Sequence, residues 1–96
     1  MIVHIVMFKF NEENREANLA KVSEMLDALM GKIPSLNSME VGKNFANEAR
    51  AMDLVITTTF ESIEALQAYA IHPEHLKVVE VIKATTEYSK VVDFEK

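Results

Sequence analysis

The sequence predicts an α+β fold of the ferredoxin-like type, with a four-stranded antiparallel sheet and helices on one face. Two observations support this class. Strand and helix patterns alternate in the order β-α-β-β-α-β, and the composition is that of an ordinary globular chain. The 96 residues are 49% hydrophobic and 26% charged, with only two glycines and two prolines. We therefore expect a single domain that spans residues 1–96.

The first predicted strand covers residues 2–10, where Val, Ile, Phe and Met dominate and no turn residue occurs. Side chains alternate between the two faces of a strand, and in this strand the residues of both faces are mostly apolar. One set holds Ile2, Val6, Phe8 and Phe10, and the other holds Val3, Ile5 and Met7. A strand that is apolar on both faces is expected to be covered on both faces.

A helix is predicted next, after the polar break at residues 11–14, which offers possible N-caps. Apolar residues then recur at spacings of three and four, as an amphipathic helix of about five turns requires. These residues are Leu19, Val22, Leu26, Leu29 and Ile33. We expect Gly31 and Pro34 to end this helix.

Two further strands are predicted at residues 38–45 and 53–60. In the first of them, apolar Met39 and Val41 alternate with charged Glu40, which indicates one solvated face. The second is β-branched throughout its centre. The polar, alanine-rich residues between them form a connection.

The last third of the chain predicts two short helices and a final strand. Ser62 suits the N-cap of a helix that carries Tyr69. His72 and Pro73 interrupt this helix, because a residue before proline disfavours helical geometry, whereas Pro73 suits the first position of a new helix. The final strand covers residues 87–94. It places Tyr88, Val92 and Phe94 on one side.

In this topology the helices can cover only one face of the sheet, and the other face carries Val3, Ile5 and Met7. Each large apolar side chain left in water forfeits about 1.5–3 kcal/mol. For roughly six such residues the loss is of order 10 kcal/mol, which is comparable to the net stability of a domain. We therefore predict that a second copy covers the helix-free face and forms an isologous homodimer.

Charge and cysteine content exclude several kinds of partner. The chain has 10 Lys+Arg against 15 Asp+Glu, a net charge of −5, which argues against nucleic acid binding. It has no cysteine and hence no disulfide or thiolate metal site. The first apolar run ends at Lys9, far short of the roughly 20 residues that span a bilayer, and it lacks the features of a signal peptide. We expect a cytoplasmic protein that binds neither nucleic acid nor membranes.

The residues best suited to chemistry cluster at 66–75, which hold two of the three histidines and one of the two tyrosines. His75 is expected near position N3 of the last helix, where the positive helix end favours a neutral imidazole that can act as a general base. Tyr69 can donate a hydrogen bond to a carbonyl or enolate oxygen. His4 shares an alternating face with Val6. If that face meets the helices, His4, Tyr69 and His75 converge.

Purely structural roles are open for the same residues. His72 suits a corner between helices, His4 a hydrogen-bonded buried position, and Tyr69 a core position with a polar tip. A metal site at His72, Glu74 and His75 lacks the further ligands that zinc requires, so we predict no metal. The sequence contains no phosphate-binding loop and no dinucleotide fingerprint, so we predict no cofactor.

The chain resembles the stress-responsive A/B barrel (Dabb) family over essentially its whole length. The resemblance rests on the sequences at residues 4–10, 40–44, 60–62, 68–75 and 91–94. It implies a ferredoxin-like protomer whose sheet pairs with that of a second copy in a closed dimeric α+β barrel. It also implies a small pocket between the helices and the sheet.

Family members include stress-induced plant proteins and a plant polyketide cyclase that performs an intramolecular aldol condensation. Resemblance to the cyclase implies that Tyr69 and His75 are catalytic and that His4 lies in the pocket. It further implies that the pocket is walled by Val6, Phe8, Val22 and Leu26, and that Val79, in place of a glycine, shortens it.

The resulting hypothesis is a homodimeric domain of this family that binds a small apolar molecule between helices and sheet. The alternative is a cofactor-independent polyketide cyclase or aldol-type lyase, in which His75 removes a proton next to a carbonyl and Tyr69 polarises the oxygen. Two weaker hypotheses are a cofactor-independent monooxygenase, which rests on fold analogy alone, and a structural role in larger shells.

Overall fold

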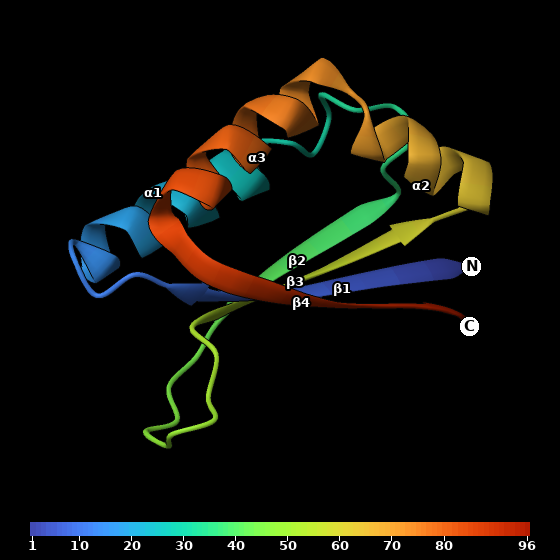
Figure 1. The fold of residues 1–96 in the computed structure, drawn as a ribbon. Helices are drawn as coiled ribbons and strands as arrows, with labels where there is room; N and C mark the ends of the chain where they lie inside the picture. The colour runs from blue at the N-terminus through green and yellow to red at the C-terminus, as the bar shows by residue number, and fades with distance from the viewer.

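The computed structural model describes residues 1–96 and confirms the predicted fold class. Its elements follow one another in the order β1 (Ile2–Phe10), α1 (Arg15–Asp27), β2 (Ser38–Lys43), β3 (Leu54–Phe60), α2 (Ile63–Ala70), α3 (Pro73–Thr85) and β4 (Thr86–Glu95). All three helices lie on one side of the sheet (Figure 1). None of them is both long and apolar enough to cross a bilayer.

The sheet has the strand order β2-β3-β1-β4, and every neighbouring pair is antiparallel. The central strand β1 places His4 opposite Thr58 of β3 on one side and Asp93 of β4 on the other. Residues directly opposite each other point to the same face. The strand register therefore decides which side chains can meet.

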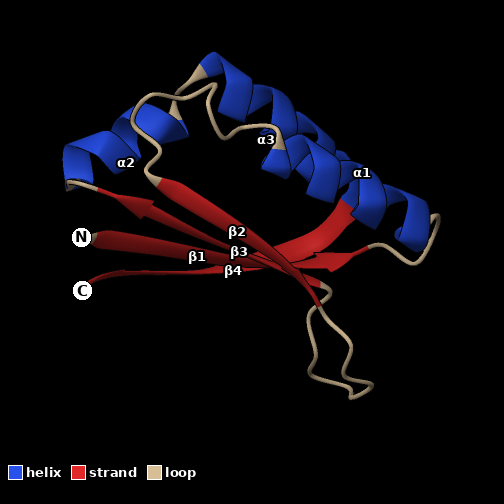
Figure 2. Cartoon of the chain, turned by 180° about the vertical axis from the view of Figure 1, so that it is seen from behind, coloured by secondary structure: helices blue, strands red, loops and turns tan.

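The hydrophobic core lies between the sheet and the helices (Figure 2). It contains Phe8 and Phe10 from β1, Val22 and Leu26 from α1, and Tyr69 from α2, all at most 4% exposed. The even-numbered residues of β1 thus form the helix-covered face, as the alternation predicted.

Helix α1 is shorter than the predicted five turns, since its 13 residues end at Asp27. Leu29 and Ile33 are nevertheless buried, because a series of tight turns carries them back to the core. In these turns the N–H of Leu29 donates to Leu26 O at 3.0 Å, and Gly31 adopts a left-handed φ of 86°. The three- and four-residue spacing therefore predicted burial correctly but overestimated the helix.

The expected strand at residues 38–45 was too long, because the ladder ends at Lys43. The Asn44 side chain closes a local turn: its Nδ2 donates to Ala46 O at 2.8 Å, and its Oδ1 accepts from Ala46 N at 3.1 Å. Residues 44–53, which we call the arm, leave the sheet on the side opposite the helices (Figure 1). Phe45, expected on the strand, lies on this arm and is 99% exposed.

The helix-free face of the sheet retains exposed apolar surface. Val92 and Phe94 of β4 are 55% and 43% exposed, and Ile5 of β1 is half-buried. Val3 differs from the expectation because it is only 5% exposed within the protomer. The protomer's accessible surface of 6099 Å² exceeds the about 5,600 Å² typical of a monomer of its mass, so there is area for a partner to cover.

Candidate active site

Tyr69 lies at the centre of an aromatic cluster built from four elements. Its ring centroid lies 5.1 Å from Phe60 of β3, 4.4 Å from His75 of α3 and 6.5 Å from His4 of β1. Helix α2 positions Tyr69, and this helix begins where the predicted N-cap Ser62 accepts the N–H of Ala65 at 3.1 Å. The structure therefore brings His4, Tyr69 and His75 together.

His75 is the third residue of α3, at the position that the sequence predicted. Its Nδ1 lies 2.9 Å from Ala70 O. A carbonyl oxygen only accepts hydrogen bonds, so Nδ1 carries the proton and Nε2 keeps a free lone pair. Burial lowers the pKa of His75, although the bond to Ala70 opposes this shift. The imidazole is thus neutral near pH 7 and can accept a proton at Nε2.

The Tyr69 hydroxyl is buried and has no hydrogen-bond partner in the protomer. Burial raises the pKa of Tyr69 to about 12, so the phenol keeps its proton throughout the physiological range. An unpaired buried hydroxyl costs about 1–3 kcal/mol in folding. The group is therefore a donor that remains available to an oxygen atom brought in from outside.

Asp93 is a site residue that the sequence reasoning missed. Its carboxylate pairs with Nδ1 of His4, and the side chains of His4 and Asp93 are 17% and 49% exposed. A carboxylate oxygen only accepts, so His4 Nδ1 carries the proton of this contact. The sequence predicted that the first and last strands pair in an antiparallel manner. It does not specify which of their residues lie opposite each other, so the contact between Asp93 and His4 could not be predicted.

His72 serves as the N-cap of α3, where its Nδ1 accepts the N–H of Glu74 at 3.1 Å. This is the structural role that the sequence left open for a histidine at the helix corner. His, Asp and Glu side chains nowhere gather in a group of three or more that could hold a metal ion.

The residues expected to line the pocket differ in how deeply they are buried. Phe8, Val22 and Leu26 are buried in the same core cluster as Tyr69, and Val6 packs against it. Val79 on α3 is partly buried and lies outside this cluster.

Two hollows lie elsewhere on the protomer. One, of about 410 Å³, lies between the arm and the neighbouring strands and is lined by residues that include Met7, Phe45 and Val55. The other, of about 290 Å³, is lined by polar residues around Asn14. Neither is lined by His4, Tyr69 or His75.

Comparison with known proteins identifies the family. The model of the stress responsive A/B barrel domain matches residues 2–96. The chain belongs to the stress-responsive A/B barrel family. One relative in this comparison, olivetolic acid cyclase from Cannabis sativa, is 27% identical over 95 residues, which cover 97% of this chain and 94% of the cyclase.

Solved structures share the ferredoxin-like fold of this chain. A dimeric ferredoxin-like protein of unknown function from Bacteroides fragilis is 28% identical, with a TM-score of 0.89 over 99% of this chain and 95% of that chain. A dimeric ferredoxin-like protein of unknown function from Jannaschia is 27% identical, with a TM-score of 0.84 over 99% of this chain and 98% of that chain. Both neighbours are dimeric, which supports the predicted homodimer.

Proposed function

We propose that this A/B barrel domain binds a small apolar molecule that carries a carbonyl oxygen, next to Tyr69 and His75. The observation that carries the proposal is the Tyr69 hydroxyl, a buried donor without an acceptor in the protomer. A ligand carbonyl would complete this hydrogen bond. The residues expected to line the pocket include Val6, Phe8 and Val79, which are apolar and favour an uncharged ligand.

Binding of two matched probes would test this proposal. We expect butyrophenone, an apolar ketone, to shift the NMR signals of Tyr69 and His75 on titration. Butylbenzene, which lacks the oxygen, should bind more weakly. Tyr69→Phe should weaken butyrophenone binding by up to about tenfold, the value of one hydrogen bond, and leave butylbenzene binding unchanged. The proposal fails if neither probe affects these residues or if Tyr69→Phe affects both probes equally.

A second candidate is cofactor-independent carbon–carbon bond formation of the aldol type. It is favoured by the free Nε2 of His75, whose ring lies 4.4 Å from that of Tyr69. In this reaction Nε2 takes a proton from the carbon next to a carbonyl, and the resulting carbanion attacks a second carbonyl of the same molecule. Tyr69 donates a hydrogen bond to the oxygen on which charge develops. The His75 imidazolium then returns the proton to that oxygen, so the overall step is a balanced cyclisation.

Turnover of a linear β-polyketide thioester would test the second candidate. We expect His75→Ala to lower the rate by about 10²–10⁴-fold, the usual contribution of a general base. His72→Asn is the matched control, because asparagine also suits an N-cap and His72 plays no part in the reaction. Cyclised product formed at the same rate by His75→Ala would exclude His75 as the base.

We also propose that the homodimer forms through the helix-free face of the sheet, where Ile5, Val92 and Phe94 offer apolar area. Two neighbouring residues of β4 provide a matched test, because Val91 and Val92 are 57% and 55% exposed and point to opposite faces. Val92→Asp should yield monomers in sedimentation velocity, whereas Val91→Asp should remain dimeric. Equal behaviour of the two variants would refute this interface.

A further inference from the structure

His4 has one ring nitrogen that the protomer leaves without a partner. The only side-chain hydrogen bond of His4 joins its Nδ1 to the Asp93 carboxylate. The other nitrogen, Nε2, forms no hydrogen bond and is not among the buried polar atoms that lack one, so solvent reaches it. It differs in this respect from the nearby Tyr69 hydroxyl, which is buried. A ligand can therefore contact the Nε2 of His4 by displacing water.

The contact between His4 and Asp93 is not needed to hold their strands together. Backbone pairing with β4 already runs along the whole of β1, from Ile2 to Phe10. The carboxylate adds the orientation of the imidazole, because it accepts the Nδ1 proton and so directs Nε2 away from Asp93. Side chains that bind a ligand are commonly held in place by a second residue in this way.

The neighbourhood of His4 is open along β4. Val91 and Asp93 lie opposite Val6 and His4, so both point to the helix-covered face of the sheet. Both are nevertheless exposed, Val91 at 57% and the Asp93 side chain at 49%. The helices therefore leave this edge of the face uncovered, which gives a small molecule access to His4.

The groups around the site define the chemistry of a ligand that binds there. Tyr69 donates a hydrogen bond, which a carbonyl oxygen accepts. The Nε2 of His4 accepts a hydrogen bond when the imidazole is neutral and donates one when it is protonated. A hydroxyl group does both, so it can pair with Nε2 in either form. The ring centroids of His4 and Tyr69 are 6.5 Å apart, so one small molecule can reach both.

We propose that the ligand of this site is a hydroxyketone. Its carbonyl binds Tyr69, its hydroxyl binds the Nε2 of His4, and Asp93 is the positioning residue that orients the imidazole. This inference rests on the proposed function and adds a second polar group to the ligand. The two contacts come from opposite layers, His4 from the sheet and Tyr69 from a helix, and together they fix the orientation of the ligand.

Four matched ketones test the second contact. Butyrophenone is the reference, and three derivatives carry one hydroxyl on the second, third or fourth carbon of its chain. We expect at least one derivative to bind about three- to tenfold more tightly than butyrophenone, the value of one hydrogen bond. NMR titration of the wild type measures each Kd. If no derivative binds more tightly than butyrophenone, the second contact is refuted and the proposed function stands.

Variants assign the gain in affinity to particular side chains. His4→Phe keeps a ring but removes Nε2, so it should abolish the gain. Asp93→Ala should also abolish it, because the imidazole is no longer oriented. Asp93→Asn should retain most of the gain, since its amide oxygen still accepts the Nδ1 proton. Glu95→Ala, on the same strand and face as Asp93, is the control and should keep the wild-type gain.

The remaining outcomes each contradict a defined statement. A full gain in His4→Phe would exclude hydroxyl binding by His4, and a full gain in Asp93→Ala would exclude Asp93 as the positioning residue. The ¹⁵N signals of His4 give an independent measurement, because Asp93→Ala should release the proton from Nδ1 and Asp93→Asn should not. If butyrophenone leaves the signals of Tyr69 and His75 unchanged, the proposed function fails and the hydroxyketone proposal fails with it.

Discussion

Tyr69 combines two properties that rarely occur in one side chain. Its ring is packed as a core residue, at 1% exposure, yet its hydroxyl has no acceptor. The ring of Tyr69 therefore contributes to core packing, and its hydroxyl separately provides a hydrogen-bond donor. Tyr69→Phe removes only the donor. This separation allows the role of the hydroxyl to be measured without disturbing the fold.

We predict that Tyr69→Phe raises the free energy of unfolding by about 1–3 kcal/mol, because the cost of the unpaired buried hydroxyl is removed. Urea denaturation measures this change. Phe60→Ala, which removes a fully buried ring from the same cluster, should instead lower the stability by about 3–5 kcal/mol. A clear loss of stability in Tyr69→Phe would mean that the hydroxyl is paired in solution.

The lowered pKa of His75 predicts a pH-dependent stability. Below its usual value near 6.5, the unfolded chain binds a proton at His75 that the folded chain does not. The free energy of unfolding should therefore be highest above this pH and decrease as the pH falls toward the lowered pKa. The pH dependence of urea denaturation in wild type and His75→Gln isolates this contribution. Identical slopes in the two proteins would contradict the lowered pKa.

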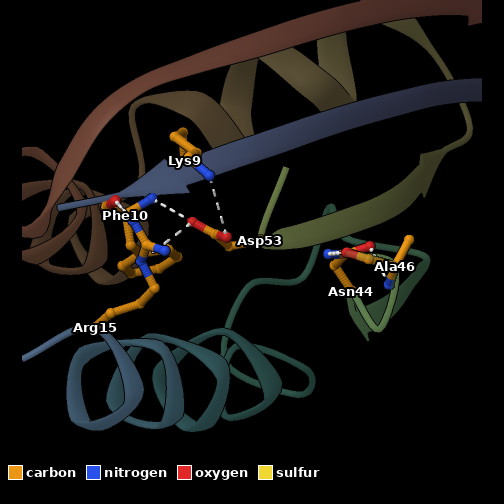
Figure 3. Close-up of polar contacts among 6 residues, drawn as sticks. All are labelled: Lys9, Phe10, Arg15, Asn44, Ala46 and Asp53. Atoms are coloured by element: carbon orange, nitrogen blue, oxygen red, sulfur yellow. Dashed lines mark hydrogen bonds and ion pairs between the residues drawn. The ribbon is translucent and has the colours of Figure 1, made fainter. Parts of the chain in front are cut away.

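At the scale of elements, the base of the arm is tied to β1 and to the start of α1 (Figure 3). Asp53 Oδ2 accepts the N–H of Phe10 at 2.7 Å, and the same carboxylate lies 3.7 Å from Lys9 Nζ and 3.9 Å from Arg15 Nε. The Asp53 N–H in turn donates to Phe8 O at 2.8 Å. One carboxylate thus fixes the direction in which the arm leaves the sheet.

Removal of this carboxylate should loosen the arm. We predict that Asp53→Ala lowers the free energy of unfolding by about 1–3 kcal/mol, because the Phe10 N–H loses its acceptor. It should also speed tryptic cleavage after Arg50, whose side chain is 91% exposed on the arm. Asp53→Asn, whose amide oxygen can still accept that bond, should change both quantities less. Unaltered cleavage in Asp53→Ala would show that the arm is held by other contacts.

At the scale of the whole molecule, the protomer has one covered and one uncovered sheet face. The covered face holds the core and the candidate site, and the uncovered face holds the apolar residues of β4 and the arm (Figures 1 and 2). In the proposed assembly, stability therefore depends on association.

Association predicts a concentration-dependent melting temperature. The Tm of the wild type should rise with protein concentration, because the folded dimer is favoured by mass action. Val92→Asp should melt at a lower temperature that does not depend on concentration. Differential scanning calorimetry across a dilution series provides the measurement. A constant wild-type Tm would contradict stabilisation by the dimer.

Hydrophobic periodicity and local helix signals predicted most of the fold. The strands, the Ser62 and His72 caps and the covered face of β1 follow from side-chain alternation, capping chemistry and Pro73, all of which act over a few residues. The same local patterns could not reveal where α1 ends, because tight turns present apolar residues at similar spacing.

The sequence by itself determined the fold class, the family and the residues available for chemistry, because periodicity and motifs are local properties of a chain. Only the tertiary structure decided that Tyr69 contacts His75, that its hydroxyl lacks a partner and that Asp93 faces His4. These facts depend on strand register and helix packing, which join distant residues such as His4 and Asp93, 89 positions apart. A shift of register by one residue would turn Asp93 to the other face of the sheet, and no local pattern specifies that choice.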